Sequence, residues 1–456
     1  MKSLEIAPIL TTQGYKKYVS VMNDEPIQNL LSNIHEQYLY WDKVKHKSIG
    51  DISPQLLWQL AKIKRMGNSS HLNFGDHKFI WNINNRLQGY LHFLDMNIGG
   101  TLESPSIVSK DDKSRYLISS LMEEAIASSQ IEGAVTTRKK AKEMLRKNKK
   151  PTNKSEQMIV NNYVTIQRIL DIKSEPLNKQ NLLSLHKLVT SNTMIDPSEE
   201  GAFRTDDDVN VVDTSNGEIV HRPPKLTEID SLLNDLYKFF NDDDETQFIH
   251  PLIKGSVIHF MLGYIHPFAD GNGRTSRALF YWYLLKKGYW LTEYLSISRL
   301  ILRAKAQYAR AFLYTEIDSH DLTYFILFNL RTIKLSFEEL RLYIQRKNEE
   351  KMKLSNFIKI AGISYKQALI IEWIYKEPTL LLTSKEAENR LAISKVSARK
   401  NLMQLVDKGY LSMIDLDKKT NGFIKSDKFD FLINRKSKTK TTTKTKKGEI
   451  VQPSLF

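Results

Sequence analysis

A short polar loop between two apolar helical stretches is the feature that most limits how this chain folds. Residues 251–265 repeat apolar side chains at helical spacing, and the same spacing resumes in TSRALFYWYLLKKG, which begins at Thr275. The intervening HPFADGNGR, residues 266–274, contains an imidazole, a carboxylate, an amide, a guanidinium group and two glycines. Few core segments hold so many polar groups. The pattern predicts a helix pair whose connecting loop carries chemistry.

The glycines and arginines of this segment suit an anion. Gly271 and Gly273 allow backbone N–H groups to turn inward, and a helix that starts near Asn272 directs its positive end at them. Arg274 and Arg277 lie three residues apart on the first turn of that helix. Both guanidinium groups can therefore reach the same polyphosphate.

Two further side chains of the loop suit catalysis on such a ligand. Asp270 can hold a Mg²⁺ ion shared with the phosphates, because this ion favours one or two carboxylates together with phosphate oxygens. His266 is the general base nearest to it in the sequence. A helix cap with a buried histidine and surface arginines is the alternative.

Residues 266–277 fit the signature HxFx(D/E)GNGRxxR without a mismatch and so resemble the Fic family. The resemblance covers about residues 110–345. It implies a mainly α-helical core that transfers AMP from ATP to a Ser, Thr or Tyr hydroxyl of target proteins, and of itself, with release of pyrophosphate. His266 would deprotonate the hydroxyl and Asp270 would hold Mg²⁺. The resemblance assigns the remaining roles as follows: the α-phosphate to Asn272 and the amides of Gly271 and Gly273, the outer phosphates to Arg274 and Arg277, and a buried anchor to Phe268.

Other donors and other chemistries stay open within this resemblance. A toxin-like branch of the fold transfers a phosphoryl group, but it typically departs from the second glycine of GNG, and Gly273 is intact. No residue identifies the base, so another nucleotide or a phosphocholine donor is an alternative. A rival of another class is a DNA-binding regulator that uses the loop only to sense nucleotide.

A second motif of the family lies upstream, where residues 128–133 fit (S/T)xxxE(G/N), the inhibitory helix motif. Ser128 and Glu132 are four apart and share a helix face, just before the stop signal Gly133. The resemblance gives Glu132 the partner Arg277, so that ATP loses its γ-phosphate contact and the enzyme is autoinhibited. A solvent-facing glutamate is the alternative. The pairing is expected either within one chain or across a homodimer.

A hairpin is expected around the Ser215–Gly217 turn. The segment 201–204 and the strand after it resemble the flap that holds the target segment, with a plain cover over the core as the alternative. An extended target peptide could add beside such an edge. The strand consists of Val209, Asn210, Val211 and Val212.

The chain divides into four parts. Residues 1–109 form a mostly helical region with turn-rich pieces such as GNSSHLNFGDH, and residues 110–350 form the Fic core. Residues 355–434 follow the order helix, helix, helix, hairpin, which resembles a winged helix-turn-helix. The last part, residues 435–456, is a Lys/Thr-rich tail that we expect to be disordered.

The C-terminal domain and the tail suggest two macromolecular partners. The presumed recognition helix presents side chains for DNA, with protein binding as the alternative: Lys395, Ser397, Arg399 and Lys400. Residues 452–456 resemble the peptide by which bacterial proteins dock on the replication sliding clamp; an uninformative end is the alternative. The formal net charge of +15 is concentrated in this tail and in residues 138–154, a basic run without a matching motif.

Composition narrows the remaining possibilities. With 456 residues the chain is long enough for roughly three domains. It has no cysteine, which excludes disulfide scaffolds, thiolate metal sites and cysteine nucleophiles and fits a reducing cytoplasm. The first residues lack an apolar signal segment, and no stretch of about 18 apolar residues occurs. We therefore expect a cytoplasmic protein with no membrane partner.

Overall fold

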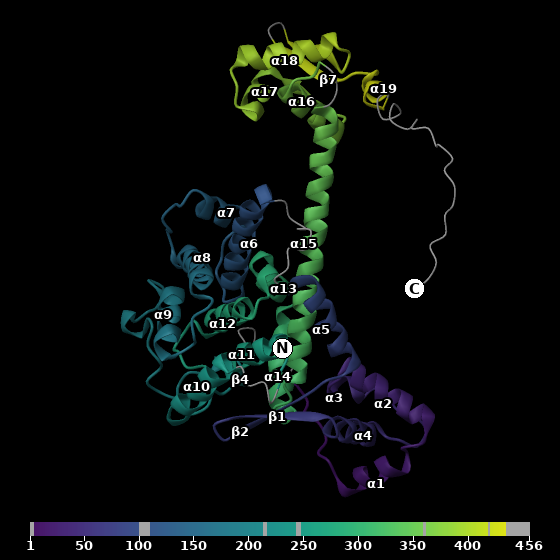
Figure 1. Ribbon diagram of the computed structural model, residues 1–456, viewed down its shortest axis with the longest axis vertical. Helices are drawn as coiled ribbons and strands as arrows, with labels where there is room; N and C mark the ends of the chain where they lie inside the picture. The colour runs from purple at the N-terminus through teal and green to yellow at the C-terminus, as the bar shows by residue number, and fades with distance from the viewer. Residues whose placement is uncertain are drawn as a thin grey trace, which may run out of the picture. The chain divides into compact units, whose positions relative to one another are not determined.

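The computed structural model describes residues 4–99, 110–212, 217–242, 248–358, 362–417 and 420–434. It is mainly helical and divides into two compact units, Met1–Arg341 and Leu342–Phe456 (Figure 1). The division lies inside helix α15, Thr323–Ile358, which is continuous in the chain from one unit to the next.

The first part of unit 1 is helical except for one hairpin. Helix α4 begins where the Ser53 hydroxyl accepts the N–H of Leu56, and α5 begins where Asn84 caps Leu87 in the same way. The elements are α1 Thr12–Ser20, α2 Glu25–Gln37, α3 Trp41–Val44, α4 Pro54–Met66, β1 Ser69–Phe74, β2 His77–Asn82 and α5 Asn85–Ile98. The piece GNSSHLNFGDH, expected to be turn-rich, is therefore mostly the strand β1, which pairs antiparallel with β2.

The remainder of unit 1 packs helices around a central pair, α11 and α12 (Figure 1). The elements are α6 Lys110–Ile131, α7 Arg138–Arg146, α8 Lys154–Ile172, α9 Lys179–Thr190, η1 Pro197–Glu199, β3 Val211–Val212, β4 Ile219–His221, α10 Leu226–Asn241, α11 Pro251–Ile265, α12 Asn272–Lys286, η2 Trp290–Tyr294, α13 Ile297–Arg303, α14 Lys305–Ile317 and α15. Strands β3 and β4 pair antiparallel; Val209 and Asn210, expected in the first strand, precede β3.

Helix α11 lies at the centre of the unit. All of its residues except Pro251 and Gly263 are buried, which explains why its apolar residues cover every face. Gly255 permits the close approach of α12, because a Cβ there would lie 3.0 Å from the Leu284 side chain. The close packing of α11 against α12 holds in place the loop that joins the end of α11 to the start of α12.

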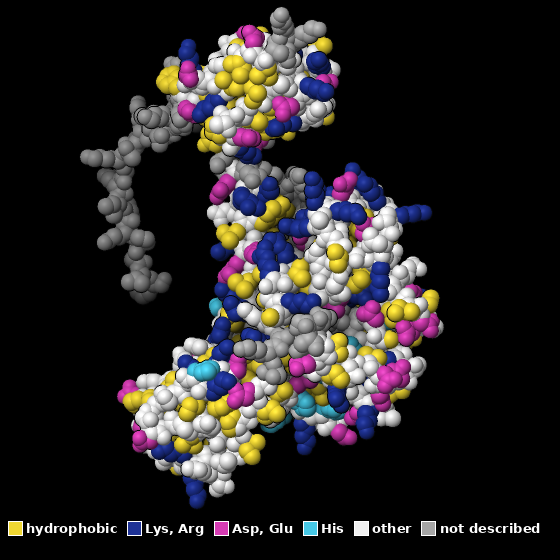
Figure 2. Space-filling view, turned by 180° about the vertical axis from the view of Figure 1, so that it is seen from behind, with side chains coloured by type: hydrophobic (Ala, Val, Ile, Leu, Met, Phe, Trp, Pro, Cys, Tyr) yellow, Lys and Arg dark blue, Asp and Glu magenta, His cyan; other side chains and the backbone are white. Residues whose placement is uncertain are grey.

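The basic run 138–154 contains helix α7, and ion pairs fasten it to its neighbours. Arg138 and Lys142 both contact the carboxylate of Glu123 on α6, and Lys140 contacts Glu156 on α8. The Lys and Arg side chains of unit 1 stand out in dark blue in Figure 2. Part of the excess charge thus serves to hold α7 in place.

Unit 2 places helices against a three-stranded antiparallel sheet of order β5-β7-β6. Its elements are α16 Tyr365–Lys376, β5 Leu382–Thr383, α17 Ser384–Leu391, α18 Lys395–Asp407, β6 Leu411–Asp417, β7 Thr420–Lys425 and α19 Phe429–Asn434. Its hydrophobic core is built from unit 2 residues, with Ile371, Leu402 and Phe423 almost fully buried.

Two sequence expectations fall wholly or partly outside the described residues. The tail 435–456, with the clamp-like peptide 452–456, lies beyond them, as does most of the Ser215–Gly217 turn. In the part of the chain that is described, no helix is both long and apolar enough to cross a membrane.

Candidate active site

His266 lies at the point where α11 ends. Its backbone is left-handed, at φ 50° and ψ 55°, a conformation that costs a non-glycine residue about 1–2 kcal/mol. The ring Nδ1 lies 3.1 Å from the carbonyl oxygen of Gly263. If Nδ1 carries the proton of that contact, Nε2 keeps a free lone pair. Burial lowers the pKa of His266 to about 4, so the ring is neutral at pH 7.

The side chain of Asn272 closes the loop on itself. Its Nδ2 donates to the carbonyl of Phe268 at 2.7 Å, and its Oδ1 accepts the N–H of Phe268 at 3.0 Å. The amide thus braces the loop backbone with its oxygen and with one of its two N–H groups. The expected contact of Asn272 with an α-phosphate stays a prediction. Phe268 itself is fully buried, as expected of an anchor.

His186, on α9, packs against the loop and hydrogen-bonds its backbone. Its ring is parallel to that of Phe268, with centroids 3.7 Å apart. Nδ1 accepts the N–H of Gly201 at 3.0 Å, so Nε2 bears the proton and donates to the carbonyl of Asp270 at 2.8 Å. Burial lowers the pKa of His186 to about 4, which keeps it neutral in this role.

Helix α12 begins in this loop with Gly271 as its N-cap, at φ 84°. A Cβ at Gly271 would lie 2.7 Å from Cγ2 of Thr190, so only glycine fits there without a shift. The first-turn N–H groups of α12 have no partner within the helix and are oriented for an anion.

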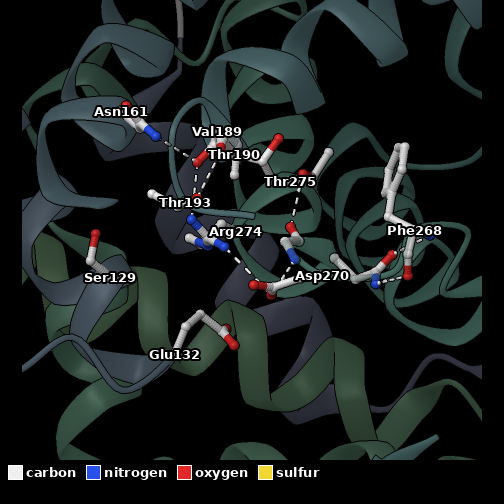
Figure 3. A network of polar contacts seen from close by, with 12 residues as sticks. Ser129, Glu132, Asn161, Val189, Thr190, Thr193, Phe268, Asp270, Arg274 and Thr275 are labelled. Carbon is white, nitrogen blue, oxygen red and sulfur yellow. Dashed lines mark hydrogen bonds and ion pairs between the residues drawn. The ribbon is translucent and has the colours of Figure 1, made fainter. Parts of the chain in front are cut away.

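Arg274 and Asp270 lie next to each other at this helix end (Figure 3). Arg274 is 1% exposed; it donates to the carbonyl of Val189 at 3.0 Å, and its Nη2 lies 3.5 Å from the carboxylate of Asp270. Its Nε has no hydrogen-bond partner among the described residues. The carboxylate of Asp270 accepts the N–H of Gly271 and remains half-exposed.

Arg277 is held by the end of α6. Its Nε donates to the hydroxyl of Ser128 at 3.0 Å, and its Nη2 contacts both the Ser128 carbonyl, at 3.0 Å, and the carboxylate of Glu132, at 2.9 Å. Burial acts to lower the pKa of Arg277, but Glu132, together with Tyr308 and Glu124, outweighs it and the pKa is raised. The pair forms within one chain.

Gly273 provides the space for this contact. A Cβ at Gly273 would lie 2.3 Å from Oε1 of Glu132 and 3.3 Å from Nη1 of Arg277. In Figure 3 the Glu132 side chain points toward the loop that carries Asp270. The carboxylate therefore lies against the first turn of α12. Gly133, which follows it at φ 90°, turns the chain away.

The structure brings most of the predicted site residues of unit 1 together at the α11–α12 loop. Sequence reasoning missed His186, because neither its spacing nor its surroundings in the sequence connect it with a loop more than eighty residues away. In unit 2, the side chains of Lys395, Arg399 and Lys400 are exposed on α18, while Ser397 is half-buried.

Part of the chain is similar to known proteins of one family. Residues 176–284 match the model of the Fic/DOC family, a range that contains α9, strands β3 and β4 and the α11–α12 loop. The chain is 34% identical over 117 residues to the protein adenylyltransferase Fic of Aedes aegypti, covering 26% of this chain and 21% of that protein. It is also 34% identical over 110 residues to the enzyme of the same name from Drosophila melanogaster, covering 24% and 20%.

Solved structures of Fic proteins were also found. A Fic family protein from Desulfovibrio desulfuricans has a TM-score of 0.48 at 20% identity, over 76% of this chain and 97% of that one. Fic-1 from C. elegans has a TM-score of 0.47 at 17% identity, over 71% and 85%.

Within a mainly helical unit the chain carries a Fic domain, residues 176–284. It spans about a fifth of the length of the curated relatives that it matches.

Proposed function

We propose that the protein is a protein adenylyltransferase that transfers AMP from ATP to a Ser, Thr or Tyr hydroxyl of target proteins and of itself. One observation carries the proposal. The loop begins with a neutral His266 and leads directly into the start of α12, where buried Arg274 and Arg277 each keep a nitrogen without a hydrogen-bond partner among the described residues. Buried guanidinium donors without acceptors fit a polyphosphate.

His266 acts as the general base. Its Nε2 takes the proton of the hydroxyl while the hydroxyl oxygen bonds to the α-phosphorus of ATP and the bond from that phosphorus to the bridging oxygen breaks. Pyrophosphate leaves with the bond's electron pair. A neutral ring is needed for this step, and the lowered pKa of about 4 keeps His266 neutral over the physiological range.

The first turn of α12 binds the phosphates. Its backbone N–H groups, with Gly271 and Gly273, contact the α-phosphate, and Arg274 and Arg277 contact the outer phosphates. Asn272 contributes indirectly, since its amide holds the loop through Phe268.

Asp270 fits a Mg²⁺ ion, because its carboxylate is half-exposed and uses one oxygen for Gly271 and Arg274. When bound, the ion neutralises charge on the phosphates and on the leaving pyrophosphate.

Glu132 restrains the enzyme. Its carboxylate pairs with Nη2 of Arg277 in the described state and so withholds this nitrogen from the outer phosphates. A phosphate placed there would also meet the Glu132 charge. Activity therefore requires that Glu132 leaves the first turn of α12.

The test is transfer of label from α-labelled ATP to protein by the wild type, Glu132→Gly and Glu132→Gly/His266→Ala. We expect label that rises at least tenfold in Glu132→Gly and disappears in the double variant. Equal labelling by the wild type and Glu132→Gly would refute the restraint. If none of the three is labelled although each binds ATP, the loop is a nucleotide sensor.

A second candidate function, DNA binding, belongs to unit 2. Its helices, followed by the β6–β7 hairpin, have the order of a winged helix, and α18 exposes Lys395, Arg399 and Lys400. The substitution of these three by alanine should weaken binding of a random DNA duplex and reduce its salt dependence, measured by fluorescence anisotropy. Unchanged anisotropy would exclude this role, and with it the regulator.

A further inference from the structure

Arg204 connects the loop that carries His266 with the segments that flank the β3–β4 hairpin, one before β3 and one after β4. Its backbone N–H donates to the carbonyl of Pro267 at 2.9 Å, and its Nε donates to the carbonyl of His266 at 3.2 Å. Two contacts to successive loop residues fix both the position and the orientation of this stretch of backbone.

The other nitrogens of the same guanidinium bind the base of the hairpin. Nη1 donates to the carbonyl of Asp206 and, at 2.9 Å, to the carboxylate of Asp207, both before β3. Nη2 donates to the carbonyl of Pro224, which follows β4. One side chain thus contacts the segment before β3, the segment after β4 and the end of α11.

The Arg204 guanidinium is buried, so water cannot replace the acceptors that it binds. The Arg204 side chain is 2% exposed, and all three of its nitrogens have acceptors. Asp207 is the only carboxylate in the set, and its second role is to accept the N–H of Leu226 at the start of α10. A buried arginine that donates mainly to backbone carbonyls fixes geometry, because carbonyl acceptors cannot follow a moving side chain as a flexible carboxylate can.

The backbone that Arg204 holds is strained. His266 adopts a left-handed conformation, which persists only where its surroundings impose it. Arg204 binds the carbonyl of this same residue, His266. Arg204 therefore helps to hold the backbone of His266, and with it the imidazole, in this conformation.

We propose that Arg204 is a positioning residue that sets the distance between the hairpin, which holds the target hydroxyl, and the base His266. The inference rests on the proposed adenylyl transfer and on the flap role of the hairpin. Transfer requires the hydroxyl to lie within hydrogen-bond reach of Nε2, and a displacement of about 1 Å costs roughly a hundredfold in rate. ATP, in contrast, is bound by α12, which Arg204 does not contact.

The experiment uses the full chain in the Glu132→Gly background and measures self-labelling from α-labelled ATP at a series of ATP concentrations. Arg204→Lys keeps the charge but cannot bridge three acceptor groups. We expect kcat to fall about a hundredfold while KM for ATP stays within about twofold. Arg222→Lys, an exposed arginine just after β4, is the matched control and should leave both unchanged.

A pH profile separates positioning from a general loss of structure. The positive charge of Arg204 is one of the lesser influences that lower the pKa of His266. Arg204→Gln should therefore move the acid limb of kcat to higher pH, whereas Arg204→Lys should leave it in place. If both variants keep the kcat of Glu132→Gly, the proposal is wrong.

A second variant decides the case in which Arg204→Lys does not fold. Asp207→Ala removes one hairpin contact and keeps the hold on His266, so we expect a kcat several-fold lower at an unchanged KM for ATP. An Asp207→Ala enzyme with full kcat would overturn the proposal. If the Glu132→Gly parent itself transfers no label, the proposed function fails first, and Arg204 then has no transfer to position.

Discussion

At the scale of single residues, Gly271 shows how closely the loop is packed. Alanine at this position has to adopt φ 84° and to bring a Cβ within 2.7 Å of Thr190. Gly288 has the same φ of 84°, but nothing lies within 4 Å of its Cβ position. We expect Gly288→Ala to lower the free energy of unfolding by about 1 kcal/mol and Gly271→Ala by roughly 1–3 kcal/mol more. Urea unfolding of both variants measures the difference; equal losses would show that the loop relaxes freely.

His186 and His266 make stability depend on pH. Burial lowers both pKa values to about 4, below the ordinary value of 6.5, so the unfolded chain binds more protons than the folded one between pH 6.5 and 4. The free energy of unfolding is therefore full above pH 6.5 and falls as the pH is lowered, by at most about 1.4 kcal/mol per group and pH unit. Urea unfolding at pH 7, 6 and 5 measures this. His266→Gln should reduce the slope, and an unchanged slope would contradict the burial of that ring.

At the scale of elements, α6 is held by a contact that the family motif does not include. The Nζ of Lys305, at the start of α14, donates to the carbonyl of Ile131 at 2.6 Å, immediately before Glu132. Lys305→Met should loosen this end and raise basal transfer by about tenfold or more, since a hydrogen bond from a charged donor contributes about 1.5–3 kcal/mol. In the Glu132→Gly background the same substitution should change nothing. An equal increase in both backgrounds would show that Lys305 acts elsewhere.

The sequence predicted the helices around the site better than it predicted the N-terminal strands. Helices α11 and α12 begin and end where their periodicity, Pro251 and the glycine loop indicate. Strand β1 was missed because SSHLNF exposes polar side chains on both faces. Its partner β2 is fixed by a contact with a distant segment, the bridge from Ile80 to Asp321. Such tertiary support leaves no local pattern.

The same limit applies to the site. The resemblance predicted that Glu132 would face Arg277, and the two side chains are in contact. It did not predict that the side-chain amide of Asn272 hydrogen-bonds the backbone of Phe268. Nor did it predict that His186, on α9, and Arg204, before β3, hydrogen-bond the loop. These contacts join segments far apart in the sequence, and neither spacing nor composition records them.

At the scale of the whole molecule, unit 2 has its own hydrophobic core, whose members all lie between residues 363 and 433. A fragment of residues 342–434 should therefore fold alone and unfold cooperatively in urea. Removal of unit 2 from the Glu132→Gly protein should leave the KM for ATP unchanged, because the loop, Arg277 and Glu132 belong to unit 1. A fragment without dispersed amide NMR signals would contradict the first expectation.

Transfer of AMP by the loop, restrained by Glu132, can be tested directly. The most direct measurement compares α-labelled with γ-labelled ATP on the Glu132→Gly protein and counts pyrophosphate. We predict covalent label from the α-position only, with one pyrophosphate released for each AMP transferred and with the wild type far below the variant. Covalent label from the γ-position would mean phosphoryl transfer instead and would contradict the account.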